Sequence, residues 1–119
     1  FLNALPAFWV GLIYDDAAQK AARALTRGWS VEQIRALREA VPAQGLTATI
    51  AGRSLRDVAR DVLAIARGGL AARGLDEASF LDPLDAVVAT GQTQADRWLE
   101  RCAGAWGGDV SKVFAEAAV

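Results

Sequence analysis

The sequence predicts an all-α fold, a small irregular bundle of about five to seven helices. Apolar residues recur at intervals of three and four along most of the chain, which is the period of an amphipathic helix. Serine, threonine or aspartate stands before most of these stretches, in the position of an N-cap. With 119 residues, 53% of them hydrophobic and 23% charged, the chain is long enough for one small core.

The first apolar run, residues 6–14, is predicted to be either a buried helix or a buried strand, because so short a run does not distinguish the two. Asp15 or Asp16 then caps an alanine-rich helix that we expect to end at Gly28. Trp29 follows directly, and we expect its large side chain to anchor the core.

Ser30 and Gln33 form a capping-box pattern and predict the start of the next helix, which Pro42 is expected to end. One face of this helix carries the residues predicted to be buried: Val31, Ile34, Leu37 and Val41. Residues 44–52 are the one stretch with an extended composition, so we expect a loop with a short strand there.

The longest predicted helix, residues 54–73, begins with a second capping pattern made by Ser54 and Asp57. Gly68 and Gly69 interrupt it near its end, where we expect another backbone to pack closely. The residues predicted to face the core recur at helical spacing: Leu55, Val58, Ala59, Val62, Ala66 and Leu70.

Three shorter helices are predicted in the last third of the chain. Asp82 as N-cap and Pro83 as first helical residue open one helix, which buries Leu84, Val87 and Val88 and ends at Gly91. Thr93 and Asp96 open another that continues to Trp106, with a shared apolar face of Ala95, Trp98, Leu99, Cys102 and Trp106. A final helix from Asp109 to the end is expected to turn Val113 and Phe114 inward.

The composition excludes several classes of function. The chain has no histidine, which excludes His-based triads and His metal sites. A net charge of −1 argues against nucleic acid and anionic membranes as partners. The single Cys102 cannot form an internal disulfide, so we expect a reducing, cytoplasmic location.

The start of the chain favours a piece of a longer protein. Residue 1 is Phe1 and the chain has no methionine, so a fragment or a processed product is the simpler interpretation. The uncharged residues 1–14 are too short for a bilayer, which takes about 20 residues. No basic stretch precedes them, so they do not resemble a signal peptide.

Candidate chemical groups each have a structural alternative. Asp15 and Asp16 are candidate metal ligands or an acid–base pair, but adjacent helical residues point about 100° apart, so helix capping is favoured. Cys102 is a candidate nucleophile, but its apolar helix face favours a buried structural cysteine.

Three further groups of residues also have a structural alternative to a functional role. The arginines of residues 53–73 are a candidate anion site, because arginine suits phosphate and carboxylate. Asp57 and Asp61 interleave with them at ion-pair spacing, which favours a solvated helix face whose charges neutralise one another. Residues 106–109 read WGGD and are expected to form a turn, since no strand or lysine accompanies them. The tryptophans are favoured as core residues over ligand-stacking ones: Trp9, Trp29, Trp98 and Trp106.

Several motifs, in this order, carry a resemblance to a known family. They are LPAFWVGLIYDD at 5–16, WSVEQIRALREAVP at 29–42, GRSLRDVARDVLAIARGGLAARG at 52–74 and FLDPLDAVVATGQTQADRWLER at 80–101, followed by AWGG and VF. Together they resemble the plant and proteobacterial type of glutamate–cysteine ligase over essentially the whole chain. The tail departs from the family pattern, with Asp109 and Lys112 in place of a serine and a proline.

The resemblance implies that residues 1–119 are the C-terminal helical segment of a larger α+β ligase whose antiparallel catalytic sheet lies upstream and is absent. The family joins the γ-carboxylate of glutamate to the amine of cysteine through a γ-glutamyl phosphate, using ATP and Mg²⁺, in glutathione synthesis. Its catalytic and metal-binding groups belong to that sheet, so no catalytic residue, no metal ligand and no bound cofactor is assigned to this chain.

The resemblance also implies partners. The expected partner is the upstream catalytic part of the same polypeptide, with Trp9 and Tyr14 as a wall against the sheet or the substrate pocket. Homo-oligomerisation is left open. A rival interpretation is a stand-alone helical module that binds a partner through a Phe8/Trp9/Leu12 patch. A helix-turn-helix DNA binder is disfavoured, because the chain lacks a basic recognition helix.

Overall fold

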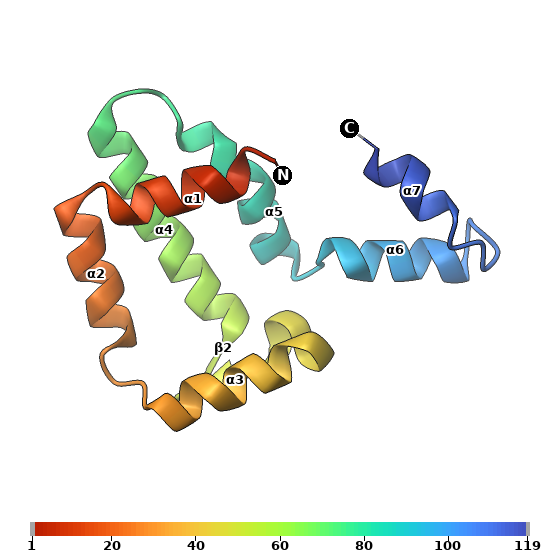
Figure 1. Ribbon diagram of the computed structural model, residues 1–119, viewed down its shortest axis with the longest axis horizontal. Coiled ribbons are helices and arrows are strands. Elements are labelled where there is room, and N and C mark those ends of the chain that lie inside the picture. The colour runs from red at the N-terminus through yellow and green to blue at the C-terminus, as the bar shows by residue number, and fades with distance from the viewer. Residues whose placement is uncertain (1, 119) are drawn as a thin grey trace.

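A computed structural model describes residues 2–118, and Figure 1 shows that they are mostly helical. The α-helices are α1 (Ala4–Ile13), α2 (Asp16–Thr26), α3 (Val31–Gln44), α4 (Leu55–Arg73), α5 (Asp82–Thr90), α6 (Gln94–Ala103) and α7 (Lys112–Ala117). The structure also has two 3₁₀ turns, η1 (Gly45–Thr47) and η2 (Ala78–Leu81). Two short strands are present, β1 (Thr49–Ile50) and β2 (Arg53–Ser54). The all-α prediction is confirmed, and residues 6–14 are helical.

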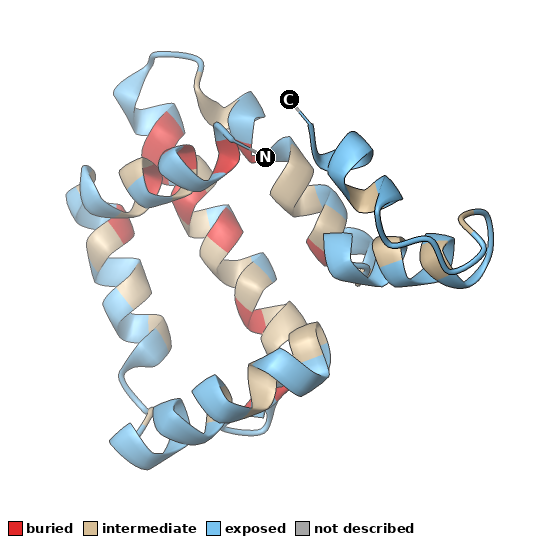
Figure 2. Ribbon diagram, turned by 45° about the vertical axis from the view of Figure 1, so that its right-hand side comes forward, coloured by how far each residue is buried: buried red, intermediate tan, exposed pale blue. Residues whose placement is uncertain are grey.

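The core lies where α1 crosses α4, with η2 and α5 closing its other side. Figure 2 shows buried residues at this crossing and further ones along α4 toward its first turns. Ala66 and Leu70 are fully buried, as predicted. Leu63 is also buried, although it was not among the residues predicted to face the core. The neighbouring Val62 was predicted to be buried and is half-exposed. The buried cluster consists of Ala7, Leu63, Ala66, Leu70, Leu81 and Val88.

Two glycines allow α1 and α4 to approach so closely. A Cβ atom on Gly69 would fall on the backbone carbonyl of Gly11, and a Cβ on Gly11 would fall on that of Ala66. The predicted close approach at Gly69 is therefore confirmed. Gly68 has open space where a Cβ would stand, so the same expectation is wrong for that residue.

Local capping explains where most helices begin. The Asp15 carboxylate accepts the Ala18 N–H at 2.9 Å and so caps α2. Ser30 and Gln33 form the full capping box of α3, and the Ser54 hydroxyl accepts the Asp57 N–H at 3.2 Å at the start of α4. Thr93 and Asp96 make a second full box at α6. Short-range patterns predicted these starts because both partners lie within three residues.

The predicted ends of α2 and α3 are wrong. α2 ends at Thr26, two residues before Gly28, and the Thr26 hydroxyl donates to the Ala22 carbonyl at 3.2 Å. α3 continues through Pro42 to Gln44. Proline so near a C-terminus removes one backbone hydrogen bond from the last turns, and the helix tolerates that loss.

The extended prediction for residues 44–52 is confirmed in its second half. β1 and β2 pair antiparallel, with Thr49 opposite Ser54 and Ile50 opposite Arg53. Ala51 and Gly52 connect them with positive φ angles of 50° and 79°, as a two-residue hairpin turn of the primed kind requires.

The start of α5 also differs from the prediction. Asp82 is its first residue and Leu81 precedes it as the N-cap, because η2 runs directly into the helix. The Asp82 side chain therefore pairs with Arg67 on α4. The predicted end at Gly91 is confirmed, with that residue in the left-handed conformation.

The predicted core faces of α3, α6 and α7 are wrong. None of the three helices has a buried residue among those described. Ile34 is exposed and Phe114 is 79% exposed, while Trp29 and Val113 are half-buried. α6 ends at Ala103, short of Trp106, because Gly104 leaves helical geometry. The predicted last helix is confirmed from Lys112 to Ala117, and Val119 lies outside the described residues.

The molecule is more open than a typical domain of its length. Its radius of gyration is 16.4 Å, whereas about 13.5 Å is expected for a compact chain of this size. Its accessible surface is 7847 Å², against about 6,200 Å² for a folded monomer of 12.6 kDa. Figure 1 shows the reason: α6 leads away from α5, and α7 turns back beyond it.

Candidate functional site

The outer face of α1 carries an exposed row of large apolar side chains. Leu5, Trp9 and Ile13 follow at four-residue intervals and are 57%, 52% and 51% exposed. Leu2, one turn earlier, continues the row. The inner face carries Ala4, Ala7 and Gly11, which are buried against the rest of the fold. We call Leu2, Leu5, Trp9 and Ile13 the α1 stripe.

The stripe replaces the patch predicted for the rival module. Phe8 and Leu12 pack against the core, so only Trp9 of the three predicted patch residues is exposed. The helical period explains the difference. Residues 8 and 12 directly follow the buried residues 7 and 11, so their side chains lie on the neighbouring part of the helix face that packs on α4. Phe8 supports Trp9 from the inner side through an edge-to-face contact, with ring centroids 5.4 Å apart.

Tyr14 lies just beyond the end of α1 and is largely exposed. The Arg73 guanidinium, from the last turn of α4, lies over its ring at 5.6 Å from the centroid. Arg73 in turn pairs with Glu77 at 3.6 Å. The side chains of Trp9 and Tyr14 are thus both exposed on the outside of the described residues.

Arg53 on β2 and Arg60 on α4 are engaged within the fold. Arg53 pairs with Asp61 at 2.6 Å, and Arg60 pairs with Asp57 at 3.4 Å. These ion pairs support the predicted self-neutralising face over an anion site.

Arg67 and Arg56 tie α4 to α5. Arg67 donates to Asp82 at 3.0 Å and also to Asp85. The hydrogen bond to Asp85, and after it the one to Asp82, holds the pKa of the Arg67 guanidinium above its usual range. Arg56 donates through Nε to the Val88 carbonyl at 2.6 Å and through a terminal nitrogen to the Ala89 carbonyl. Its charge therefore lies at the negative end of the α5 dipole.

The other candidate groups take structural roles. Asp15 caps α2, as favoured. Cys102 was predicted to be a buried structural cysteine, but it is only half-buried on α6. Residues 106–109 form a turn, with Gly107 and Gly108 at positive φ and the Gly108 N–H donating to the Cys102 carbonyl at 2.7 Å. Within residues 2–118, no cluster of three metal-ligating side chains occurs.

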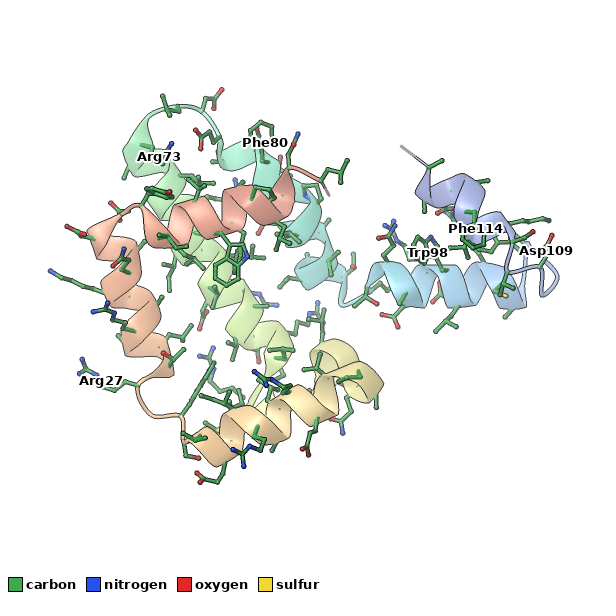
Figure 3. All side chains as sticks on the ribbon, in the orientation of Figure 1. Arg27, Arg73, Phe80, Trp98, Asp109 and Phe114 are labelled. Carbon is green, nitrogen blue, oxygen red and sulfur yellow. The ribbon has the colours of Figure 1, made fainter. Side chains whose placement is uncertain are left out.

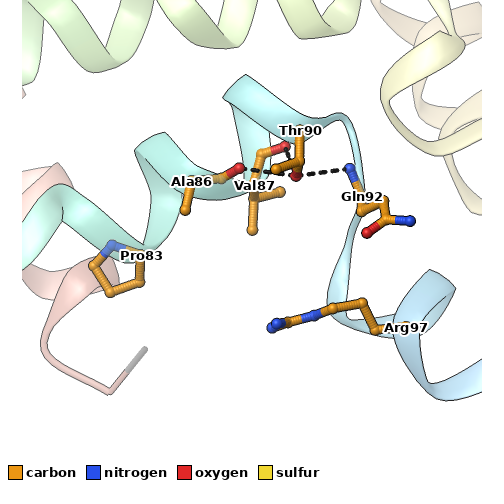
Figure 4. Close-up of a pocket in the computed structure, with 6 residues that line it drawn as sticks. All are labelled: Pro83, Ala86, Val87, Thr90, Gln92 and Arg97. Carbon is orange, nitrogen blue, oxygen red and sulfur yellow. Dashed lines mark hydrogen bonds between the residues drawn. The ribbon is translucent and has the colours of Figure 1, made fainter. Parts of the chain in front are cut away.

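A shallow pocket of about 300 Å³ lies between α5 and α6, and Figure 4 shows its lining. The Thr90 hydroxyl donates to the Ala86 carbonyl at 2.9 Å and accepts the Gln92 N–H at 3.2 Å. Arg97 supplies its one charged group. The other polar side chains of this lining are the Thr90 hydroxyl and the Gln92 amide.

A larger groove, of about 890 Å³, separates the start of α1, η2 and α5 from α6 and α7. We call it the arm groove and call α6 with α7 the arm. Figure 3 shows Phe80 beside the first turn of α1 and Trp98 on the side of α6 that faces α7. The Trp98 Nε1 atom is buried and has no acceptor among the described residues.

No helix among the described residues is both long enough and apolar enough to cross a membrane.

Comparison with known proteins points to one family over nearly the whole chain. The sequence profile of Glutamate-cysteine ligase family 2 matches residues 2–116. The chloroplastic glutamate–cysteine ligase of Arabidopsis thaliana is 47% identical over 115 residues, which cover 97% of this chain and 22% of that protein. The Nicotiana tabacum protein of the same name is 42% identical, with the same shares covered.

The chloroplastic glutamate–cysteine ligase A of Oryza sativa subsp. indica is 39% identical, over 97% of this chain and 23% of that protein. The chain thus spans less than a quarter of the length of these curated relatives. Their names place those proteins in chloroplasts, whereas the cytoplasmic location expected for this chain stays a prediction.

Proposed function

Because the chain belongs to the glutamate–cysteine ligase family, we propose that it is the C-terminal portion of an ATP-dependent ligase that forms γ-glutamylcysteine. The chemistry in this proposal belongs to a catalytic portion outside residues 1–119. The relatives are more than four times as long as the chain, which leaves room for that portion.

The demands of the reaction are proposed to be met outside this chain. Transfer of phosphate from ATP to the γ-carboxylate of glutamate requires Mg²⁺ clamping and neutralisation of the phosphates. Among residues 2–118 there is no acidic cluster suited to a metal, and the arginines of α4 are engaged in ion pairs or with backbone carbonyls. ATP and Mg²⁺ are therefore proposed to be bound by the catalytic portion.

The α1 stripe is the observation that best supports a docked role. Three large apolar side chains on one face of α1 and that of Leu2 just before it stand exposed, whereas a monomer usually buries or disperses such groups. We assign this face to the contact with the catalytic portion. Trp9 and Tyr14 would then lie against the catalytic sheet or at the edge of its substrate pocket.

The test measures ATP-dependent formation of γ-glutamylcysteine from glutamate and cysteine. The full-length polypeptide that contains this chain is expected to catalyse it, and the purified 119-residue chain is expected to show none. Turnover by the 119-residue chain would mean that the active site lies within it. A full-length polypeptide with no ligase activity would favour the rival, a binding module that uses the α1 stripe.

A further inference from the structure

The arm is joined to the rest of the fold by a short link, yet it packs closely on none of the other described elements. Residues 91–93 connect α5 to α6. The arm is held together by the ion pair of Arg101 on α6 with Glu116 on α7. Since the arm has its own internal contact and no close packing on the body, the arm groove beside it stays open.

Both walls of the arm groove are mostly apolar. The body wall presents Leu2, Leu5 and Phe80, and the arm wall presents Trp98 and the end of α7. The one charged residue in the lining is Glu116, which is already paired with Arg101. The groove therefore suits an apolar segment and offers no free charge to a polar ligand.

The arm groove also adjoins the α1 stripe. Leu2 and Leu5 belong to both, so the exposed apolar surface continues from α1 into the groove. Together these features account for part of the difference between the observed surface of 7847 Å² and the roughly 6,200 Å² of a typical monomer of this mass.

We infer that the arm groove clasps an apolar segment of the catalytic portion, namely the segment that leads into Phe1. The inference rests on the proposed function. Residues 2–6 line the groove, and Figure 1 shows the start of α1 on the side of the body where α7 lies. A segment joined there is held beside the groove at high effective concentration, which a free partner or a second copy does not have.

Amide hydrogen exchange tests the clasp by comparing residues 94–118 in the full-length polypeptide and in the 119-residue chain. We expect exchange at least about tenfold slower in the full-length polypeptide, because docking removes local opening of the arm. Phe80→Ala on the body wall is expected to reverse most of that protection without touching the arm. Leu75→Ala, at an exposed apolar residue outside the groove, is the matched control and should leave the protection intact.

A second variant addresses the arm wall. Trp98→Ala should also release the arm in the full-length polypeptide, whereas Leu99→Ala, on the same helix but outside the groove lining, should not. Equal exchange of residues 94–118 in the two proteins would overturn the clasp. So would protection that appears in the 119-residue chain with dimerisation, since a second copy would then fill the groove.

The ligase assay separates this inference from the proposed function. Ligase activity with an unprotected arm would overturn the clasp alone. A protected arm in a full-length polypeptide without ligase activity would contradict the proposed function alone.

Discussion

At the scale of single residues, Gly69 controls how closely α1 and α4 can pack. Gly69→Ala would place a methyl group on the Gly11 carbonyl, so we expect a loss of about 2–3 kcal/mol in the free energy of unfolding. Gly68→Ala is a matched control one residue away, with open space at its Cβ position. That variant should be neutral or stabilise by up to about 1 kcal/mol through helix propensity.

Urea unfolding of the 119-residue chain measures both glycine variants. If Gly69→Ala were as stable as Gly68→Ala, the helix crossing would be looser than the structure shows.

Asp96 makes the start of α6 sensitive to pH. Hydrogen bonds from the Thr93 hydroxyl at 2.7 Å and the Thr93 N–H at 2.8 Å hold the pKa of the Asp96 carboxyl below its usual range. The folded state thus favours the anion. The resulting stability is present above the ordinary pKa and is lost as pH falls through the lower folded pKa.

Backbone chemical shifts of residues 94–103 test this prediction. Asp96→Ala should reduce α6 helicity at neutral pH, and the unmodified chain should approach the variant only in strong acid. Asp109→Ala is the control, since that carboxylate bonds to Ser111 outside α6. A difference between the chain and Asp96→Ala that persists at the lowest pH would contradict the role of the anion.

At the scale of elements, Arg56 joins the start of α4 to the end of α5. Its guanidinium donates to the Val88 and Ala89 carbonyls, which have no partner within their own helix end. Arg56→Met keeps the side-chain stem and removes these charged hydrogen bonds. We expect it to lower the free energy of unfolding by about 1–2 kcal/mol.

Arg60→Met is the control for Arg56→Met. Arg60 lies on the same helix, but its ion pair with Asp57 is exposed and should be worth less than about 0.5 kcal/mol. Equal losses in urea unfolding would show that the α4–α5 contact does not depend on Arg56.

The elements that the sequence predicted well are those governed by local chemistry. Ser30, Ser54 and Thr93 each begin a helix because their capping partners are three residues away. Burial was predicted less well, because an apolar helix face in the sequence does not indicate which other element, if any, packs against it. Ile34 and Phe114 lie on such faces and remain exposed among the described residues.

The candidate site shows the same limit. Trp9 and Tyr14 could be singled out from sequence, and the family resemblance is confirmed by the comparisons. The exposed face of α1 depends on which side turns toward α4, and the Gly11–Gly69 contact decides that. Glycine spacing in α1 and α4 was the signal that could have predicted it. The role of Trp9 and Tyr14 at a substrate pocket stays a prediction.

At the scale of the whole molecule, the exposed apolar surface is the dominant feature. The α1 stripe, the arm groove and the apolar faces of α3 and α7 are all uncovered within the described residues. If the chain folds as part of a longer polypeptide, packing against the rest of that polypeptide would cover all of these surfaces. These residues then stabilise the complete protein more than they stabilise this chain alone.

Trp9 gives the sharpest test of that idea. In the 119-residue chain its side chain is 52% exposed, so Trp9→Ala should change the free energy of unfolding by less than about 1 kcal/mol. In the full-length polypeptide the same change should cost about 2–4 kcal/mol, because a docked indole is fully removed from water. Leu75→Ala is the comparison, since Leu75 is exposed and lies outside the α1 stripe and the arm groove, so its loss should cost little in both proteins.

Thermal unfolding of the short and the long protein, each unmodified and with either substitution, measures the coupling between Trp9 and the rest of the polypeptide. Equal costs of Trp9→Ala in the short and the long protein would mean that the α1 stripe stays exposed after the catalytic portion is added. The surface would then be free for another partner, which is the rival interpretation. A larger cost in the long protein, with the Michaelis constants for glutamate and cysteine unchanged, would place Trp9 against the sheet and away from the substrate pocket.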